Sequence, residues 1–351
     1  MQMITEINAD LKTRWAELRA GNPHSYTRND ARQLGVSEAE LICTRLGDGV
    51  VRLKNEPQAI MARIPVLGRV KAITRNDHMV LEQKGAYPQP QFGGPVGLFV
   101  SETIDLRIFW QAWGSAFWVK EGSGESVRES LQFFDRHGEA IHKIYVIEGS
   151  DRTAFDRIVS DFTSVDQVPI DVLPKTARQN GNGAAPVDEE KFRKDWLALQ
   201  DTHDFFLLLR DHRISRTRAL EIAPEGMAVK VETKSLRKVF QHASSTAMPI
   251  MIFVGNPGMI QIHTGPIVNV VDARGWLNIL DPELDLHAKE EAIHSSWVVT
   301  KPTRDGLVTS LECYDAEGEL LIQLFGKRKP GIPEMPEWRK FMLDLSIAIA
   351  E

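Results

Sequence analysis

Two stretches of the chain decide the fold, LQFFDRHGEAIHKIY at 131–145 and LECYDAEGELLIQLF at 311–325. They align without a gap, at an offset of 180 residues. The same offset relates HMVLEQKG (78–85) to GMIQIHTG (258–265), and IDLRIFWQAWGSAFWV (104–119) to LDLHAKEEAIHSSWVV (284–299). Three matches at one offset indicate an internal duplication.

The repeated segments have the pattern of β-strands. Apolar, β-branched residues alternate with polar ones, and turn signals such as GNPG at 255–258 separate the runs. Helical patterns precede the strands of each half, and a further one at 336–350 closes the chain. Strands grouped between helices are typical of the α+β class. We therefore predict an α+β fold, an internal duplication of two similar domains, each a large antiparallel sheet with flanking helices.

A linker separates the two halves. Residues 173–191, LPKTARQNGNGAAPVDEEK, combine Pro, Asn, Gly and charged residues and have no apolar period. The predicted organisation is an N-terminal repeat at 1–172, the linker at 173–191 and a C-terminal repeat at 192–351.

Composition narrows the class of protein. The 351 residues are 42% hydrophobic and 26% charged, as in a globular protein, and the net charge of −6 argues against nucleic-acid binding. The chain lacks a secretory signal pattern and any apolar stretch of about 18 residues or more, so we expect no membrane-embedded segment. The two cysteines, Cys43 and Cys313, are far apart, which fits a reducing cytoplasm and excludes a cysteine-rich zinc module. Phosphate-binding glycine loops, GxSxG and HExxH are absent.

One histidine stands out, in DTHDFFLLLRDHRISR at 201–216. The spacing predicts a helix with His203 on its buried, apolar face, in a stripe made of Leu199, His203, Phe206, Leu207 and Arg210. In that setting His203 is a core histidine bonded to a neighbour, a catalytic base, or a ligand to something large and flat. The helical leads of the two halves align at an offset of 188, which pairs Arg28 with Arg216 but His203 with Trp15. A residue found in one copy alone favours a function over a requirement of the fold.

Several cations occur in the same repeats. Arg107 lies in the alternating run IDLRIFWQAW, which predicts a partly enclosed guanidinium. Because arginine stays charged, it needs an anionic partner, and an internal salt bridge to Asp105 or Glu102 is one alternative. Arg216, Lys301 and Arg328 stand at the ends of predicted elements. A large flat ligand with two carboxylates would use a ring ligand, aromatic walls and several such cations.

Together these segments resemble the HemS-type cytoplasmic haem-trafficking proteins, also called hemin-degrading factors. The resemblance covers essentially the whole chain and rests on DTHDFFLLLRDHRISR, IDLRIFWQAW, SSWVVTKPT and IQLFGKRKPGIPE. It implies paired similar domains with haem b (iron protoporphyrin IX) in a cleft between them. It also implies that His203 is the proximal iron ligand, that Arg107 acts on the distal side, and that the propionate side carries Arg216, Lys301, Gln323 and Arg328.

Phe325 departs from the family pattern, which often has Tyr there, and so a distal hydroxyl is missing. His78 is considered for a second site. An apolar helix face would keep the His203 imidazole neutral, and we expect its other nitrogen to donate to a backbone carbonyl rather than to Asp204.

The resemblance implies a function in haem transport and iron acquisition. The protein would receive imported haem, carry it, and support its oxidative degradation with an electron donor and oxygen. Its partners would be an inner-membrane haem importer and a downstream haem oxygenase, and its state a monomer or dimer. A haem carrier without enzymatic activity and a non-haem interaction platform are the alternatives. A hydrolase with His203 as base lacks a visible nucleophile.

Overall fold

The computed structural model describes residues 2–23, 25–122, 124–175, 187–329 and 331–347. Residues 176–186 of the predicted linker and 348–350 of the last predicted helix lie outside these ranges. The helices are α1 (Gln2–Gly21), α2 (Thr27–Leu34), α3 (Glu38–Cys43), α4 (Pro57–Arg63), α5 (Arg152–Phe162), α6 (Glu189–Leu197), α7 (Asp204–His212), α8 (Arg216–Glu221), α9 (Ser235–Thr246) and α10 (Pro336–Ile347).

The strands of the first half are β1 (Val50–Arg52), β2 (Gly68–Arg75), β3 (Met79–Ala86), β4 (Gln91–Gly93), β5 (Val96–Phe99), β6 (Asp105–Phe109), β7 (Trp113–Glu121), β8 (Arg128–Asp135) and β9 (Ala140–Ser150). Those of the second half are β10 (Ala228–Val231), β11 (Ile250–Asn256), β12 (Met259–Gly265), β13 (Val270–Ala273), β14 (Trp276–Leu280), β15 (Leu284–Ala288), β16 (Ser295–Thr303), β17 (Gly306–Tyr314) and β18 (Leu320–Gly326).

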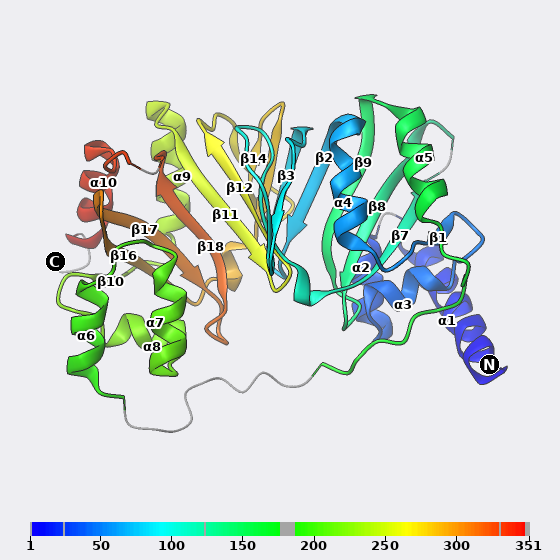
Figure 1. The fold of residues 1–351 in the computed structure, drawn as a ribbon, viewed down its shortest axis with the longest axis horizontal. Coiled ribbons are helices and arrows are strands. Elements are labelled where there is room, and N and C mark those ends of the chain that lie inside the picture. The colour runs from blue at the N-terminus through cyan, green and yellow to red at the C-terminus, as the bar shows by residue number, and fades with distance from the viewer. Residues whose placement is uncertain (1, 24, 123, 176–186, 330, 348–351) are drawn as a thin grey trace. The chain divides into compact units, whose positions relative to one another are not determined.

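The same strand order occurs twice. In the first half the order is β1-β7-β8-β9-β2-β3, and β4, β5 and β6 form an antiparallel meander. In the second half it is β10-β16-β17-β18-β11-β12, and the meander is β13, β14 and β15. The strand pairs around β8 and around β17 are antiparallel. The predicted α+β fold, with a duplicated antiparallel sheet and flanking helices, is confirmed (Figure 1).

Two compact units make up the chain, and each takes one hairpin turn from the other repeat. Unit 1 is Met1–Arg75, Glu82–Thr176 and Gly255–Gln261, and unit 2 is Asn76–Leu81, Ala177–Val254 and Ile262–Glu351. Asn256 donates to the carbonyl of Ile141 at 2.9 Å, and Asn76 donates to that of Leu321 at 2.8 Å. These residues correspond at the 180-residue offset, so the duplication includes the exchanged turns. The division at 1–172 and 192–351 stays a prediction about domains.

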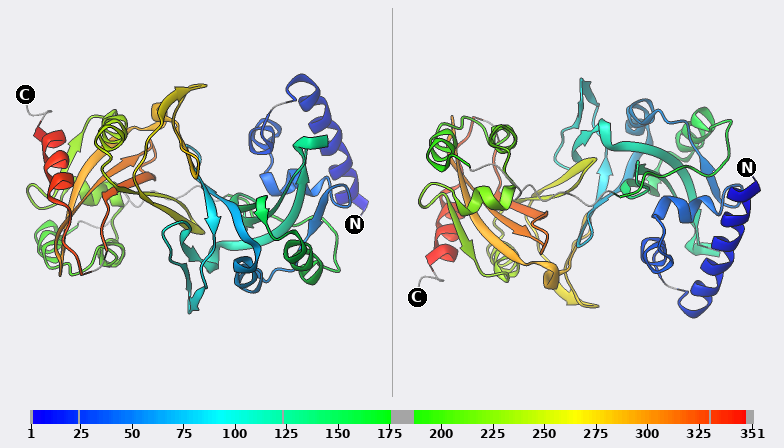
Figure 2. Two further views of the ribbon diagram at one scale, coloured as in Figure 1. Left: turned by 90° about the horizontal axis from the view of Figure 1, so that it is seen from above. Right: turned by 90° about the horizontal axis from the view of Figure 1, so that it is seen from below.

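In unit 1 helices cover both faces of the sheet. Ile60 of α4 and Phe155 of α5 pack in one buried cluster with Phe133 of β8. Ile42 of α3 packs with Phe134, the next residue along β8, in a separate cluster. Successive strand residues point to opposite faces, so α4 and α5 lie on one side and α3 on the other (Figure 2).

Unit 2 repeats this layering. Phe240 of α9 and Trp338 of α10 pack against Leu311 on one face of β17. Tyr314, on the other face of β17, packs with Trp196 of α6 and Phe205 of α7. The face of β17 that carries Ser310, Glu312 and Tyr314 is therefore turned towards α6, α7 and α8. No helix among the described residues is long and apolar enough to cross a membrane.

Candidate functional site

His203 lies at the start of α7 and is exposed, not buried. It is the N-cap residue of α7, and 84% of its side chain is accessible to solvent. Its Nδ1 lies 2.6 Å from Oδ1 of Asp201, and its backbone N–H donates to the same oxygen at 2.9 Å. These contacts, led by the backbone N–H, hold the pKa of Asp201 below its usual value. Because an ionised carboxylate only accepts, Nδ1 carries a hydrogen, and Nε2 is the ring nitrogen left to bind a ligand.

The predicted stripe through His203 is therefore wrong. Phe205 and Leu208 form the buried face of α7, whereas Phe206 is 70% exposed and Leu207 is 43% exposed. The cause is the start of the helix. Leu199 lies in the turn between α6 and α7, so a helical count from Leu199 to His203 crosses residues that are not helical. The expected backbone carbonyl partner is also wrong, since Asp201 supplies a carboxylate.

Three predicted site residues meet on one carboxylate that the sequence analysis missed, Glu312 of β17. Arg216 donates to both Glu312 oxygens at 2.9 Å, Lys301 donates at 2.7 Å, and Gln323 donates at 2.9 Å. Ser310 and Tyr314 also donate to it. A sequence signal existed, since LECYD places a charged residue in mid-strand where the first repeat has Gln132.

Burial and charge together set the titration of this cluster. Glu312 is completely buried, which by itself raises its pKa, yet Arg216 and Lys301 bring that pKa well below its usual value. Burial lowers the pKa of Lys301 to about 8, against the opposing pull of Glu312. Lys301 is almost fully covered, whereas 26% of the Arg216 side chain remains exposed. Of these two cations, Arg216 is thus the one that can also reach a ligand.

The cluster lies beneath α7. Lys301 Nζ is 4.5 Å and Arg216 Cζ is 5.2 Å from the centre of the Phe205 ring, so both stack on it as cation–π pairs. Phe205 is two residues from His203. The fixed Phe205 ring therefore links the start of α7 to the buried charges of β16 and β17.

Phe325 lies on β18 after Gln323, and Arg328 lies two residues beyond the end of that strand. Arg328 lies 3.6 Å from Asp305, and its charge contributes to the lowered pKa of Asp201, which holds His203. Phe325 is two residues beyond Gln323 on β18. Its ring packs edge-on against the ring of Phe253, with 5.1 Å between the ring centres. Unit 2 thus holds His203 and all the predicted propionate-side residues.

Arg107 belongs to unit 1. Its guanidinium forms an ion pair with Asp105 and donates to the carbonyl of Leu106 at 3.2 Å. Its side chain is 27% exposed, which confirms the predicted partial enclosure, and the internal salt bridge is present. His78 lies in the turn after β2, where its carbonyl accepts from the backbone N–H of Lys289 at 2.9 Å. A second site at His78 stays a prediction.

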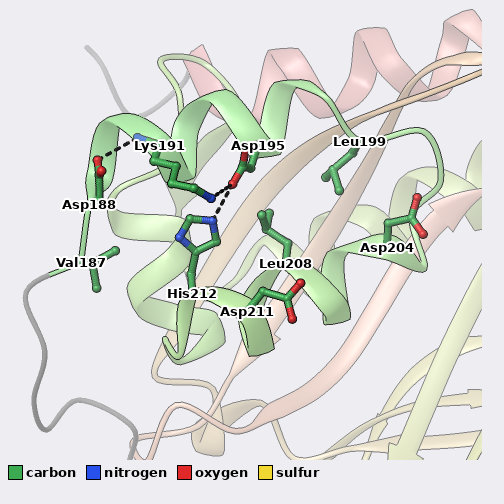
Figure 3. Close-up of a pocket in the computed structure, with 9 residues that line it drawn as sticks. All are labelled: Val187, Asp188, Lys191, Asp195, Leu199, Asp204, Leu208, Asp211 and His212. Carbon is green, nitrogen blue, oxygen red and sulfur yellow. Dashed lines mark hydrogen bonds and ion pairs between the residues drawn. The ribbon is translucent and has the colours of Figure 1, made fainter.

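A pocket of about 470 Å³ opens between α6 and α7 (Figure 3). Its polar wall is mainly acidic, with His212 and Lys191 both bound to Asp195, at 2.9 and 2.7 Å. The lining residues are Val187, Asp188, Lys191, Asp195, Leu199, Asp204, Leu208, Asp211 and His212. Four carboxylates repel an anionic ligand, and His203 is not part of the lining, so this pocket is distinct from the candidate site. Among the described residues, no group of three or more metal-binding side chains is assembled.

Comparisons with known proteins agree with this organisation. The haemin-degrading HemS/ChuX domain matches residues 35–162 and again 213–345. The hemin transport protein HmuS of Yersinia pestis is 37% identical over 335 residues, covering 95% of this chain and 96% of that protein. The hemin transport protein HemS of Yersinia enterocolitica is 37% identical over 326 residues, covering 93% and 94%.

Solved structures give the same result for the fold. The holo form of PhuS, a haem-binding protein from Pseudomonas aeruginosa, superposes with a TM-score of 0.92 at 40% identity, covering 96% of this chain and 99% of that chain. ChuS, described as an E. coli haem oxygenase, has a TM-score of 0.87 at 34% identity with the same coverage. The chain therefore belongs to the haemin-degrading HemS/ChuX domain family and contains that domain twice.

Proposed function

We propose that this protein binds haem b in the cytoplasm, receives it after import, carries it, and supports its oxidative degradation to release iron. The observation that supports this most is the His203 imidazole. Its Nδ1 is held by Asp201, and its Nε2 faces solvent. Haem iron takes an axial imidazole, and a carboxylate on the far ring nitrogen orients that imidazole and raises its basicity.

The surroundings of His203 fit the rest of the haem molecule. Phe206 and Leu207 expose apolar surface on the same helix, which a porphyrin face would cover favourably. Arg216 and Arg328 supply cations for the two propionates. In this proposal Lys301 and Gln323 act indirectly, because they hold Glu312 and through it Arg216. Phe325 adds an apolar ring in place of a hydroxyl.

The relatives support the same function and its setting. Two are hemin transport proteins, one solved neighbour binds haem, and another is described as a haem oxygenase. We propose an inner-membrane haem importer as the donor of haem and a downstream haem oxygenase as an acceptor. The working form would be a monomer or a dimer.

Haem binding is tested by titrating hemin into wild type and His203→Ala while the Soret band is recorded. The variant should bind more weakly and its ferric spectrum should shift, because the axial nitrogen is lost. His294→Ala, which removes another exposed histidine of unit 2, is the matched control and should behave as wild type. An unchanged spectrum in His203→Ala would remove His203 as the ligand.

Degradation is tested with an electron donor, oxygen and catalase. We propose that Arg107 acts on the distal side. A guanidinium stays charged, so it would orient water that supplies protons rather than give up its own. Haem loss that persists with catalase and falls in Arg107→Ala supports directed cleavage. Haem loss that catalase abolishes, with no effect of Arg107→Ala, identifies a carrier.

A further inference from the structure

Unit 1 contains a buried tyrosine–histidine pair outside the proposed haem site. The Tyr87 hydroxyl lies 2.5 Å from Nε2 of His142, and the two residues are 3% and 1% exposed. Nδ1 of His142 lies 2.8 Å from Oγ1 of Thr74, which donates to the sulfur of Met259 at 3.3 Å. Because the Thr74 hydroxyl gives its hydrogen to Met259, we assign the His142 ring hydrogen to Nδ1, where it is donated to Thr74, so that Nε2 accepts from the Tyr87 hydroxyl. Burial lowers the pKa of His142 to about 3, so the ring is neutral and Nε2 is a free base.

A row of packed aromatic rings connects Tyr87 to a partly exposed tryptophan. Tyr87 meets Phe99 at 5.1 Å between ring centres, Phe99 meets Phe92 at 5.3 Å, and Phe92 meets Trp110 at 5.0 Å. All three contacts are edge-on. Phenylalanine is much harder to oxidise than tyrosine or tryptophan. Phe99 and Phe92 are therefore not oxidised themselves. They fill the space between the two oxidisable residues, Tyr87 and Trp110, with close-packed rings through which an electron can be transferred.

The sequence keeps Trp110 in this place. A Cβ on Gly97 would lie 2.5 Å from Cζ2 of Trp110, so only glycine at 97 allows the indole to lie against β5. Trp110 follows β6, three residues after Arg107. Its indole N–H is buried and has no hydrogen-bond partner among the residues that the structure describes.

Trp110 and Tyr87 differ in whether the residue loses its N–H or O–H proton when it is oxidised. Among the described residues no group accepts a hydrogen bond from the Trp110 N–H, so an oxidised Trp110 keeps its proton there and stays a strong oxidant. An oxidised phenol is a far stronger acid than an imidazolium, and His142 Nε2 already accepts the Tyr87 hydrogen bond. If Trp110 is oxidised first, the oxidation is therefore transferred to Tyr87, and Tyr87 is the residue that remains oxidised.

We propose that Tyr87 and His142 form a redox-active pair that takes up one oxidising equivalent from Trp110. A strong one-electron oxidant removes one electron from Trp110, and Tyr87 returns an electron to the indole. Tyr87 becomes a neutral tyrosyl radical, its O–H bond breaks, and the proton moves to Nε2 of His142. Oxidants that haem forms with peroxide are one source, but the pair is defined by unit 1 alone and does not rest on the proposed haem site.

The test uses the full, haem-free chain with a ruthenium(III) polypyridyl as the oxidant, generated by light from ruthenium(II) with a cobalt(III) quencher. Freeze-quenched samples are examined by electron paramagnetic resonance. We expect a tyrosyl signal with the high-field shift of a hydrogen-bonded phenoxyl. The chain has only four tyrosines, so assignment is direct. Wild type without any tyrosyl signal would overturn the proposal.

Variants assign the radical. Tyr87→Phe should lose the signal, while Tyr145→Phe, which alters a tyrosine of β9 in unit 1, should keep it. His142→Gln should also lose it, since an amide accepts a hydrogen bond but is no base. Trp110→Phe should lower the radical yield. If Tyr87→Phe does not fold, His142→Gln and Trp110→Phe still decide. A tyrosyl signal that is as strong in His142→Gln and Trp110→Phe as in wild type would contradict the assignment of the radical to Tyr87. Loss of the signal in Tyr145→Phe would contradict it as well.

Discussion

Gln132 and Glu312 occupy the same place in the two repeats. Gln132 pairs with Lys143 across β8 and β9, and Glu312 pairs with Gln323 across β17 and β18. Gln132 is neutral and donates to Ser130 at 3.0 Å, whereas Glu312 is charged and accepts hydrogen bonds from Arg216 and Lys301. The difference lies on the sheet face towards α6, α7 and α8. The two repeats thus share their apolar faces and diverge where the second repeat carries His203 above a buried charge cluster.

Each repeat also buries a lysine, with opposite results. Lys143 binds Glu38 of α3, and although burial lowers its pKa, Glu38 and further anions raise it above the usual value. The pKa of Lys301 falls to about 8, because burial is joined by repulsion from Arg216. The first repeat pairs its buried lysine with a helix carboxylate, whereas in the second two cations share one strand carboxylate.

The largest expected effect comes from making the second repeat like the first, with Glu312→Gln. Two cations then lose a buried counter-charge, and breaking such a pair costs about 3 kcal/mol or more. Unfolding by urea, followed by circular dichroism, measures this loss. Exposed Glu317→Gln is the control and should change stability little. If Glu312→Gln is as stable as wild type, the cluster is not held together by the carboxylate.

The two lysines should titrate far apart. In a chain with ¹³C-labelled lysine side chains, the Cε signal of Lys301 should titrate near pH 8, while that of Lys143 should stay in the charged form to higher pH. Between about pH 8 and the ordinary lysine pKa, the unfolded chain binds more protons at Lys301 than the folded chain does. The Lys301 contribution to stability therefore rises with pH through that window. Lys301 titrating together with Lys143 would contradict the comparison.

The fold could be predicted from the sequence because the same alternation of apolar and polar residues occurs in β8 and, 180 residues later, in β17. His203 was found because it lacks a counterpart, but its burial was mispredicted, since where α7 begins depends on the turn after α6. Glu312 was missed for a different reason. Its partners come from α8 and β16, and only tertiary packing brings Arg216 and Lys301 onto a single mid-strand carboxylate.

A smaller effect should follow from Asp201→Asn. The first repeat has Trp15 where the second has His203, and Asp201 is what turns that histidine into an oriented base. An amide can bind either ring nitrogen and leaves the imidazole less basic. Loss of such a partner typically weakens metal binding about 10- to 100-fold. Hemin titration measures the change, and Asp211→Asn, a substitution farther along α7, should leave affinity unchanged.

The smallest effect should come from Arg328, which the 180-residue offset pairs with Glu148 of the first repeat. Arg328→Ala should weaken hemin binding by about 1 kcal/mol, or roughly fivefold in Kd, because the guanidinium is partly exposed and its contact with Asp305 is loose. Arg328→Glu places at this position the residue type that the first repeat has at Glu148. It should weaken hemin binding further, because the carboxylate repels the propionates. Hemin dimethyl ester separates charge from shape, since it has no free carboxylates. Both substitutions should matter less with the ester, and an equal loss with ester and free acid would show that Arg328 acts by holding the loop at Asp305 and Asp201 rather than by binding a propionate.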